Sequence, residues 1–175
     1  SVGTPMSASL FDLGVHLFHN GKYLHENGMG PNIYFPKIEQ YSDALFLNKV
    51  LEYIQTQLNL PKGSVKLTCL IETLPAIFQT EEIAHALRDN IVGFNCGRWD
   101  YFASMLKNLP DMPFPDRNTL SMDRGFAEAY VRRIVQSCHK RGMSAMGGMS
   151  NKVLTNNPNK NIYCLKYFHG LNNIL

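Results

Sequence analysis

The sequence predicts an α/β protein in which parallel strands alternate with helices. Short apolar, β-prone runs alternate with longer segments whose apolar residues recur at helical spacing, about four times over 175 residues. This alternation is typical of a parallel sheet with crossover helices. Acidic residues also follow two of the apolar runs, Glu72 directly after one and Asp100 close after the next. Acids delivered at strand ends are typical of the active sites of α/β barrels.

The first part of the chain predicts a helix, a strand and a second helix. Leu10, Leu13 and Leu17 recur at helical spacing, which predicts a helix over residues 9–26. The glycine- and proline-containing segment 27–31 ends that helix. A strand is predicted over residues 33–38 and a helix over residues 42–60, before the turn at residues 61–63.

The middle of the chain predicts two strands that are buried on both faces. Residues 65–71 and 91–96 are almost continuously apolar, as in strands covered by helices. A single helix is expected between them over residues 74–88, with Pro75 tolerated in its first turn. Another helix is expected over residues 99–109.

The last predicted elements complete about four β/α units. A proline-rich loop over residues 111–123 leads to a helix over residues 124–141, which Gly142 caps. A short strand over residues 143–146 ends in Gly147-Gly148. A closed eight-stranded barrel usually needs about 250 residues. The predicted fold is therefore a partial (β/α)8 TIM-type barrel over residues 1–150, with two strand edges that need covering.

Composition excludes several classes of protein. With 45% hydrophobic and 18% charged residues, the chain is expected to form one core. A net charge of +3 with scattered lysines and arginines is too weak for a nucleic-acid interface. No apolar run approaches the roughly 20 residues needed to cross a bilayer. The four cysteines lack CxxC spacing, which indicates a reducing compartment. The oligomeric state stays open.

Several motifs together resemble malate synthase of the A type. They are Ser9-Leu10-Phe11-Asp12-Leu13-Gly14, Phe18-His19-Asn20, Tyr34-Phe35-Pro36-Lys37-Ile38-Glu39, Leu70-Ile71-Glu72-Thr73, Leu87-Arg88-Asp89, Gly93-Phe94-Asn95-Cys96-Gly97-Arg98-Trp99-Asp100-Tyr101, Pro115-Asp116-Arg117 and Ala145-Met146-Gly147-Gly148-Met149. The resemblance is specific because long motifs occur in the family's order, from about Ser9 to Ser150. Residues 151–175 are rich in asparagine, lack the family's continuation and are predicted to form a divergent tail.

The resemblance implies a Mg²⁺-dependent Claisen condensation of acetyl-CoA with glyoxylate, which gives malate and CoA in the glyoxylate cycle. By motif, Glu72 and Asp100 would be the metal ligands, a set that suits Mg²⁺. Backbone amides near Gly97, Trp99 and Asp100 would bind the glyoxylate carboxylate. Met146, Gly147 and Gly148 would lie near the acyl end of acetyl-CoA.

The resemblance also implies that no catalytic residue lies in this chain. The family's charge-stabilising arginine belongs to a motif that precedes the start of this chain, and nothing before Ser9 supplies it; the aspartate base belongs to a carboxyl-terminal domain. Neither Asp116 nor Asp123 matches the motif of that base, which must lie within hydrogen-bond reach of the proton it removes. We therefore expect the 175 residues alone to be incomplete and inactive.

Other interpretations remain open at this point. Glu72 and Asp100 could be helix caps or first-turn acids favoured by the helix dipole, and Lys37 could pair with Glu39. The chain could be a citrate lyase β-like CoA-ester lyase, or a non-catalytic remnant that binds metal or a partner chain. The expected compartment is the peroxisome or glyoxysome in a eukaryote and the cytoplasm otherwise. Asn173-Ile174-Leu175 is no import signal of the Ser-Lys-Leu type.

Overall fold

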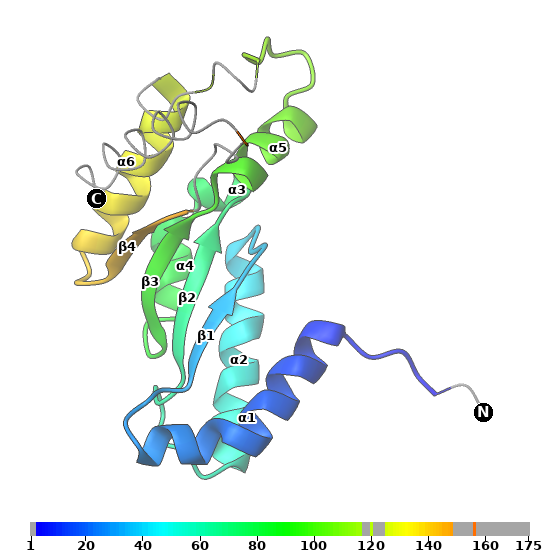
Figure 1. Cartoon of the computed structure of the whole chain (residues 1–175), viewed down its shortest axis with the longest axis vertical. Coiled ribbons are helices and arrows are strands. Elements are labelled where there is room, and N and C mark those ends of the chain that lie inside the picture. Colours follow the sequence, from blue (N-terminus) through cyan, green and yellow to red (C-terminus); the bar gives the residue numbers. More distant parts are fainter. Residues whose placement is uncertain (1–2, 117–119, 121–124, 149–155, 157–175) are drawn as a thin grey trace.

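The fold is built on one parallel sheet, as the sequence predicted. The structure is a computed structural model that describes residues 3–116, 120, 125–148 and 156. Four parallel strands lie in the order β1-β2-β3-β4 (Figure 1). Their bounds are β1 Asn32–Phe35, β2 Lys66–Ile71, β3 Ile91–Cys96 and β4 Ser144–Gly147. Each strand pairs with the next one along the chain, which is the arrangement of neighbouring strands in a β/α barrel.

One helix precedes the first strand, and the others connect the strands, with a helical layer packed beside the sheet. Their bounds are α1 Ala8–Glu26, α2 Tyr41–Gln57, α3 Leu74–Ile77, α4 Thr80–Ala86, α5 Arg98–Asn108 and α6 Gly125–His139. Helix α4 packs against both α2 and α6, and α6 packs against β3 and β4 (Figure 1). None of the helices in the described part of the chain is long and apolar enough to cross a membrane.

The core lies between the sheet and this helical layer. Leu67, Cys69 and Ile71 alternate along β2, are fully buried, and belong to one apolar cluster with Phe94 of β3 and Ile134 of α6. Alternation places these side chains on one face of the sheet. The core therefore fixes the register of the strands, and with it the position of whatever follows each strand.

One predicted element is wrong: the single helix over residues 74–88 is two helices, α3 and α4. Around the break, Phe78 and Gln79 donate backbone hydrogen bonds three residues back, to Pro75 and Ala76. The side chain of Gln79 accepts from the backbone N–H of Tyr41 at 3.0 Å. Contacts distant in sequence thus hold the break, which local helix propensity cannot show.

Each of the two outer strands is hydrogen-bonded to one neighbouring strand in the described part of the chain. Within the described residues, β1 pairs only with β2, and β4 pairs only with β3. This is the arrangement expected of part of a barrel, in which both edges would continue into further strands. The predicted tail over residues 151–175 lies outside the described residues, apart from Asn156.

Candidate metal centre

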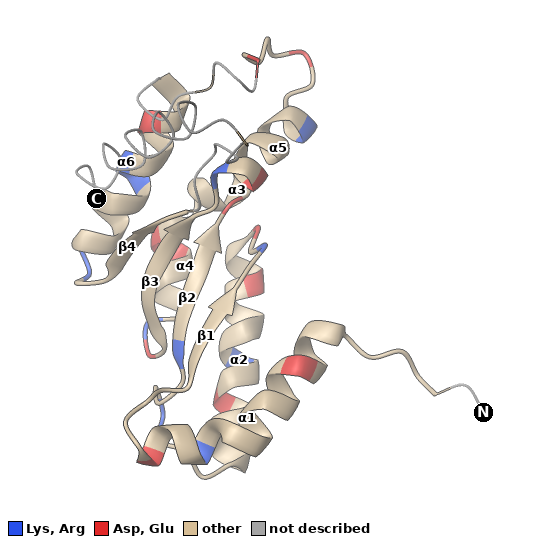
Figure 2. Cartoon of the chain, in the orientation of Figure 1, with Lys and Arg blue, Asp and Glu red and all other residues tan. Residues whose placement is uncertain are grey.

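The carboxyl ends of β1, β2 and β3 bring charged residues together at one edge of the sheet. Lys37 lies two residues after β1, Glu72 directly follows β2, and Asp100 lies in the first turn of α5, just after β3. Ile71 is paired in register with Cys96, so the segments that follow these two strands leave the sheet side by side. Figure 2 shows acidic and basic residues at this end of the strands.

The two acids converge on a single positively charged atom. The Nζ atom of Lys37 lies 3.1 Å from Oε1 of Glu72 and 2.7 Å from Oδ1 of Asp100. The two carboxylate oxygens are therefore no further apart than the sum of these two distances. Glu72 is buried, with 2% of its side chain exposed, whereas 54% of the Asp100 side chain is exposed. Glu72 is thus the buried acid of the site, and Asp100 is the acid that faces solvent.

Lys37 is the residue of this site that the sequence analysis missed. Glu39 was an open alternative as its partner, but Lys37 pairs with Glu72 and Asp100 instead. The backbone N–H of Glu39 donates to Asp43 at the start of α2. Lys37 has a positive φ of 60° and donates its own backbone N–H to Oε1 of Glu72 at 2.9 Å. Its place near the end of the strand predicted over residues 33–38 was the signal that pointed to this edge.

Gly97 leaves the space that the Glu72 carboxylate fills. A Cβ atom at position 97 would lie 2.6 Å from Cβ and 2.7 Å from Oε2 of Glu72. Real Cβ atoms do not approach that closely, so residue 97 has to lack a side chain where the two segments meet. The glycine predicted for close backbone approach therefore contacts a candidate metal ligand.

The charges of the site stabilise one another. The hydrogen bond from Lys37 and its positive charge lower the pKa of the Asp100 carboxyl, although partial burial opposes this effect. Partial burial opposes the charge of Lys37, but its hydrogen bonds to Asp100 and Glu72 outweigh that effect and raise the pKa of the ammonium. Lys37 and Asp100 are therefore both charged near neutral pH.

The helix-cap interpretation fails for Glu72. Thr73 is the N-cap of α3, and its side chain accepts a hydrogen bond from the N–H of Ala76 at 3.4 Å. Asp100 does lie in the first turn of α5, where the helix dipole favours a negative charge. That position is compatible with a ligand role, since the same carboxylate also faces Glu72 across the Lys37 ammonium.

Comparisons with known proteins agree on one family. Malate synthase A from Escherichia coli (strain K12) is 50% identical over 151 residues, which covers 85% of this chain and 28% of the relative. Malate synthase from Dictyostelium discoideum is 42% identical over 163 residues, 91% of this chain and 30% of the relative. A family model described as "Malate synthase, TIM barrel domain" matches residues 1–169. The chain belongs to the malate synthase family.

The chain spans less than a third of the length of those relatives. The family match continues past Ser150, into the segment predicted to diverge. A solved structure, the Haloferax volcanii malate synthase lead(II) complex, shares the fold at a TM-score of 0.56 and 12% identity, over 76% of this chain and 35% of that one. The predicted resemblance and the partial-barrel fold are confirmed. A 42% identical malate synthase from Ricinus communis is named glyoxysomal.

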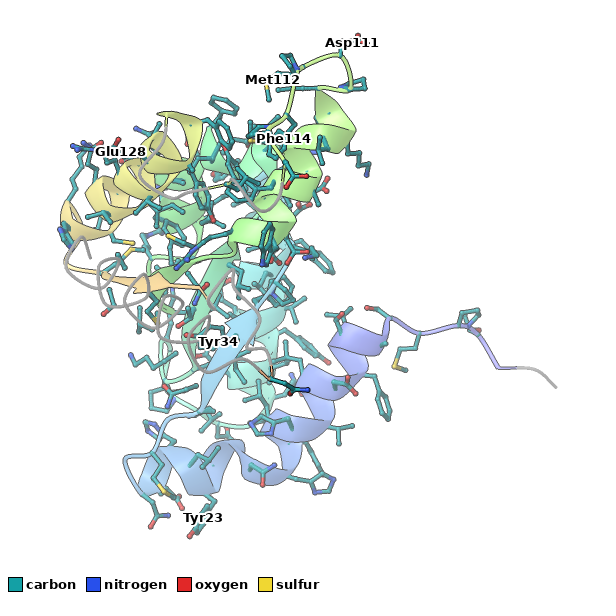
Figure 3. All side chains as sticks on the ribbon, turned by 45° about the horizontal axis from the view of Figure 1, so that its top comes forward. Tyr23, Tyr34, Asp111, Met112, Phe114 and Glu128 are labelled. Atoms are coloured by element: carbon teal, nitrogen blue, oxygen red, sulfur yellow. The ribbon has the colours of Figure 1, made fainter. Side chains whose placement is uncertain are left out.

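The residues predicted to lie near the acyl end of acetyl-CoA are at the same edge of the sheet. Tyr34 on β1, labelled in Figure 3, donates its hydroxyl to Sδ of Met146 on β4 at 3.0 Å. A guanidinium nitrogen of Arg98 donates to the carbonyl of Gly148 at 3.4 Å. A Cβ atom on Gly148 would lie 2.2 Å from the carbonyl oxygen of Cys96, so the turn after β4 packs directly on the end of β3.

Aromatic residues of α5 and α6 pack beside the candidate metal centre. Tyr130 of α6 is buried and donates its hydroxyl to the carbonyl of Ile71, the residue before Glu72. Its ring stacks on Tyr101 of α5 with 4.0 Å between the ring centroids. Trp99 packs edge-on against Phe102, with their centroids 5.9 Å apart. Helices α5 and α6 thus fix the ends of β2 and β3 around the acids.

The donor set fits Mg²⁺. Carboxylate oxygens are the hard ligands that this ion prefers, and it usually binds only one or two of them, with water and substrate oxygens in the other positions. In the part of the chain that the structure describes, no group of three His, Cys, Asp or Glu side chains could hold a metal ion. Two carboxylates are thus what these residues would supply, and the Lys37 ammonium shows that a cation fits between them.

Proposed function

We propose that this chain forms the metal- and glyoxylate-binding part of a malate synthase. The observation that carries the proposal is the convergence of the Glu72 and Asp100 carboxylates on one cation at the carboxyl ends of the strands. Glu72 and Asp100 would hold Mg²⁺, which acts as a Lewis acid on the aldehyde of glyoxylate. Membership of the malate synthase family supports the Claisen condensation of acetyl-CoA with glyoxylate rather than the chemistry of a citrate lyase β-like enzyme.

The start of α5 would position the glyoxylate carboxylate. Gly97 is the N-cap of α5, and Trp99 and Asp100 lie in its first turn. The first amides of a helix have no partner within the helix and attract anions. Glyoxylate bound there would lie beside the cation, because Asp100 belongs to the same turn. Met146, Gly147 and Gly148 would line the acyl end of acetyl-CoA at the neighbouring strand.

The test is metal binding by the 175-residue chain and two charge-neutral variants. We expect Mg²⁺ or Mn²⁺ titrated in a calorimeter to bind the parent chain and to bind more tightly when glyoxylate is present. Glu72→Gln and Asp100→Asn should each weaken binding by about tenfold or more, because each loses one of two charged ligands. Glu52→Gln is the control, since Glu52 pairs with Lys62 away from this site.

Two outcomes would contradict parts of the proposal. If Glu72→Gln bound metal as tightly as the parent, Glu72 would not be a metal ligand. If the parent bound no metal, a non-catalytic remnant would be favoured. The family's arginine and aspartate base are expected outside these residues, so we expect no malate from acetyl-CoA and glyoxylate when the chain is assayed alone. Malate formation above background would show that this expectation is wrong.

A further inference from the structure

Lys37 stands where a metal ion would contact both acids. Its Nζ atom is within 3.1 Å of Glu72 and 2.7 Å of Asp100. The residue is also held through its backbone, because its N–H donates to the same Glu72 carboxylate at 2.9 Å. Its side chain nevertheless remains 58% exposed. The backbone is thus anchored at the site while the ammonium lies on a flexible, solvent-facing stem.

The ammonium has an electrostatic role in the absence of metal. Two carboxylates side by side repel each other, and Glu72 is too buried for water to screen its charge well. The single positive charge of Lys37 offsets one of the two negative charges. A divalent cation would offset both. The ammonium and the divalent cation cannot contact the same two oxygens at once, because they repel each other at that range.

We propose that the Lys37 ammonium is a built-in counter-ion that a divalent cation must displace in order to bind Glu72 and Asp100. This inference rests on the metal site assigned under the proposed function. Displacement requires only that the side chain turn toward solvent, while the backbone hydrogen bond to Glu72 stays in place. Lys37 thereby disfavours monovalent ions, which bring no more charge than the ammonium they would replace.

The first test compares metal affinity in two lysine variants. We expect Lys37→Met to bind Mn²⁺ about tenfold more tightly than the parent in calorimetry, because the competing charge is gone. Lys62→Met is the matched control: Lys62 is 59% exposed and also bridges two acids, Glu52 and Asp89, at 3.6 and 2.9 Å. Its metal affinity should equal that of the parent. Unchanged or weaker Mn²⁺ binding by Lys37→Met would overturn the proposal.

A second measurement needs no variant and so does not depend on Lys37→Met folding. The parent chain is treated briefly with an amine-acylating reagent, with and without Mg²⁺, and modification of each lysine is measured by mass spectrometry. We expect Mg²⁺ to raise modification of Lys37 several-fold and to leave Lys62 unchanged. Equal modification of Lys37 at saturating Mg²⁺ would overturn the proposal.

These outcomes separate this inference from the proposed function. Metal binding that is weakened in Glu72→Gln but is equally tight in Lys37→Met and in the parent would overturn the counter-ion role alone. Absence of binding in the parent and in Lys37→Met would overturn both. Binding by the parent that is weakened in Glu72→Gln and tightened in Lys37→Met would support both.

Discussion

Gly97 is the residue on which the position of the Glu72 carboxylate depends. The two residues come from neighbouring strand ends, and the absence of a side chain at position 97 lets the carboxylate lie against the backbone. The geometry of the candidate metal centre therefore rests on a residue that donates nothing to the ion. Small displacements matter at such a site because metal ligands act within tenths of an ångström.

The first prediction follows from this contact. Gly97→Ala would place a methyl group 2.7 Å from Oε2 of Glu72, so the carboxylate or the backbone must move. We expect Mn²⁺ affinity to fall about tenfold and the free energy of unfolding in urea to fall by about 1–3 kcal/mol.

Gly14→Ala is the control for that prediction. Gly14 lies within α1, and an added Cβ there meets nothing within 4 Å. Alanine is the better helix former, so stability should rise by about 0.5–1 kcal/mol and metal binding should not change. Equal metal affinity in Gly97→Ala and Gly14→Ala would show that residue 97 does not shape the site.

The acids of the site could be predicted from the sequence, and their lysine partner could not. Glu72 and Asp100 follow two apolar runs, and the carboxyl ends of neighbouring parallel strands meet at one edge. The partner of Lys37 depends on its positive φ and on the direction in which the chain leaves β1. Glu39 is closer to Lys37 in the sequence, but its backbone N–H donates to Asp43 at the start of α2.

At the scale of elements, α4 and α6 are joined by a pair of buried hydroxyls and a surface ion pair. Oγ1 of Thr80 and Oγ of Ser137 lie 2.9 Å apart in the core. Glu81, the next residue, pairs with Lys140 and Arg141, which directly follow α6. The same contacts fix where α4 begins, so the break after α3 could not be foreseen from the residues 74–88 alone.

The ion pair between α4 and α6 predicts a pH dependence. The Arg141 hydrogen bond lowers the pKa of the Glu81 carboxyl from 4.5 to about 2. Because the pKa of Glu81 is lower in the folded state, the unfolded chain takes up a proton at Glu81 at a higher pH than the folded chain does. The pair therefore stabilises the fold fully above pH 4.5, and that contribution is lost as the pH falls toward about 2.

Glu81→Gln tests this dependence. The melting temperature of the variant should be lower than that of the parent at neutral pH and should fall less steeply through the acid range. Glu82→Gln serves as the control, because Glu82 is the exposed neighbour in the same helical turn. Superimposable melting profiles for the parent and Glu81→Gln would rule out a stabilising role for the pair.

At the scale of the whole molecule, the alternation of strands and helices was the most predictable feature. Strands β2 and β3 begin and end within one residue of the predicted ranges, because nearly continuous apolar runs are bounded by charged or turn residues. The outer strands are shorter than the core strands and their edges are unpaired within the described residues. Unpaired edges can recruit other chains.

We therefore expect the 175-residue chain to associate as its concentration rises, as measured by sedimentation velocity. Tyr34→Lys on β1 should weaken association, because a charge on an edge strand disfavours pairing. Tyr23→Lys on α1 is the matched control; both tyrosines are labelled in Figure 3. Tyr34 and Tyr23 are 56% and 62% exposed. A monomer at every concentration would contradict the prediction.

Trp99 gives the candidate metal centre an optical reporter. It is the one tryptophan in the sequence, it is next to Asp100, and its ring packs on Phe102 in the same helix. Any rearrangement of the first turn of α5 changes the surroundings of this indole. Excitation of tryptophan in the unlabelled chain would therefore follow occupancy of the site through emission intensity or wavelength, in real time and without a dye.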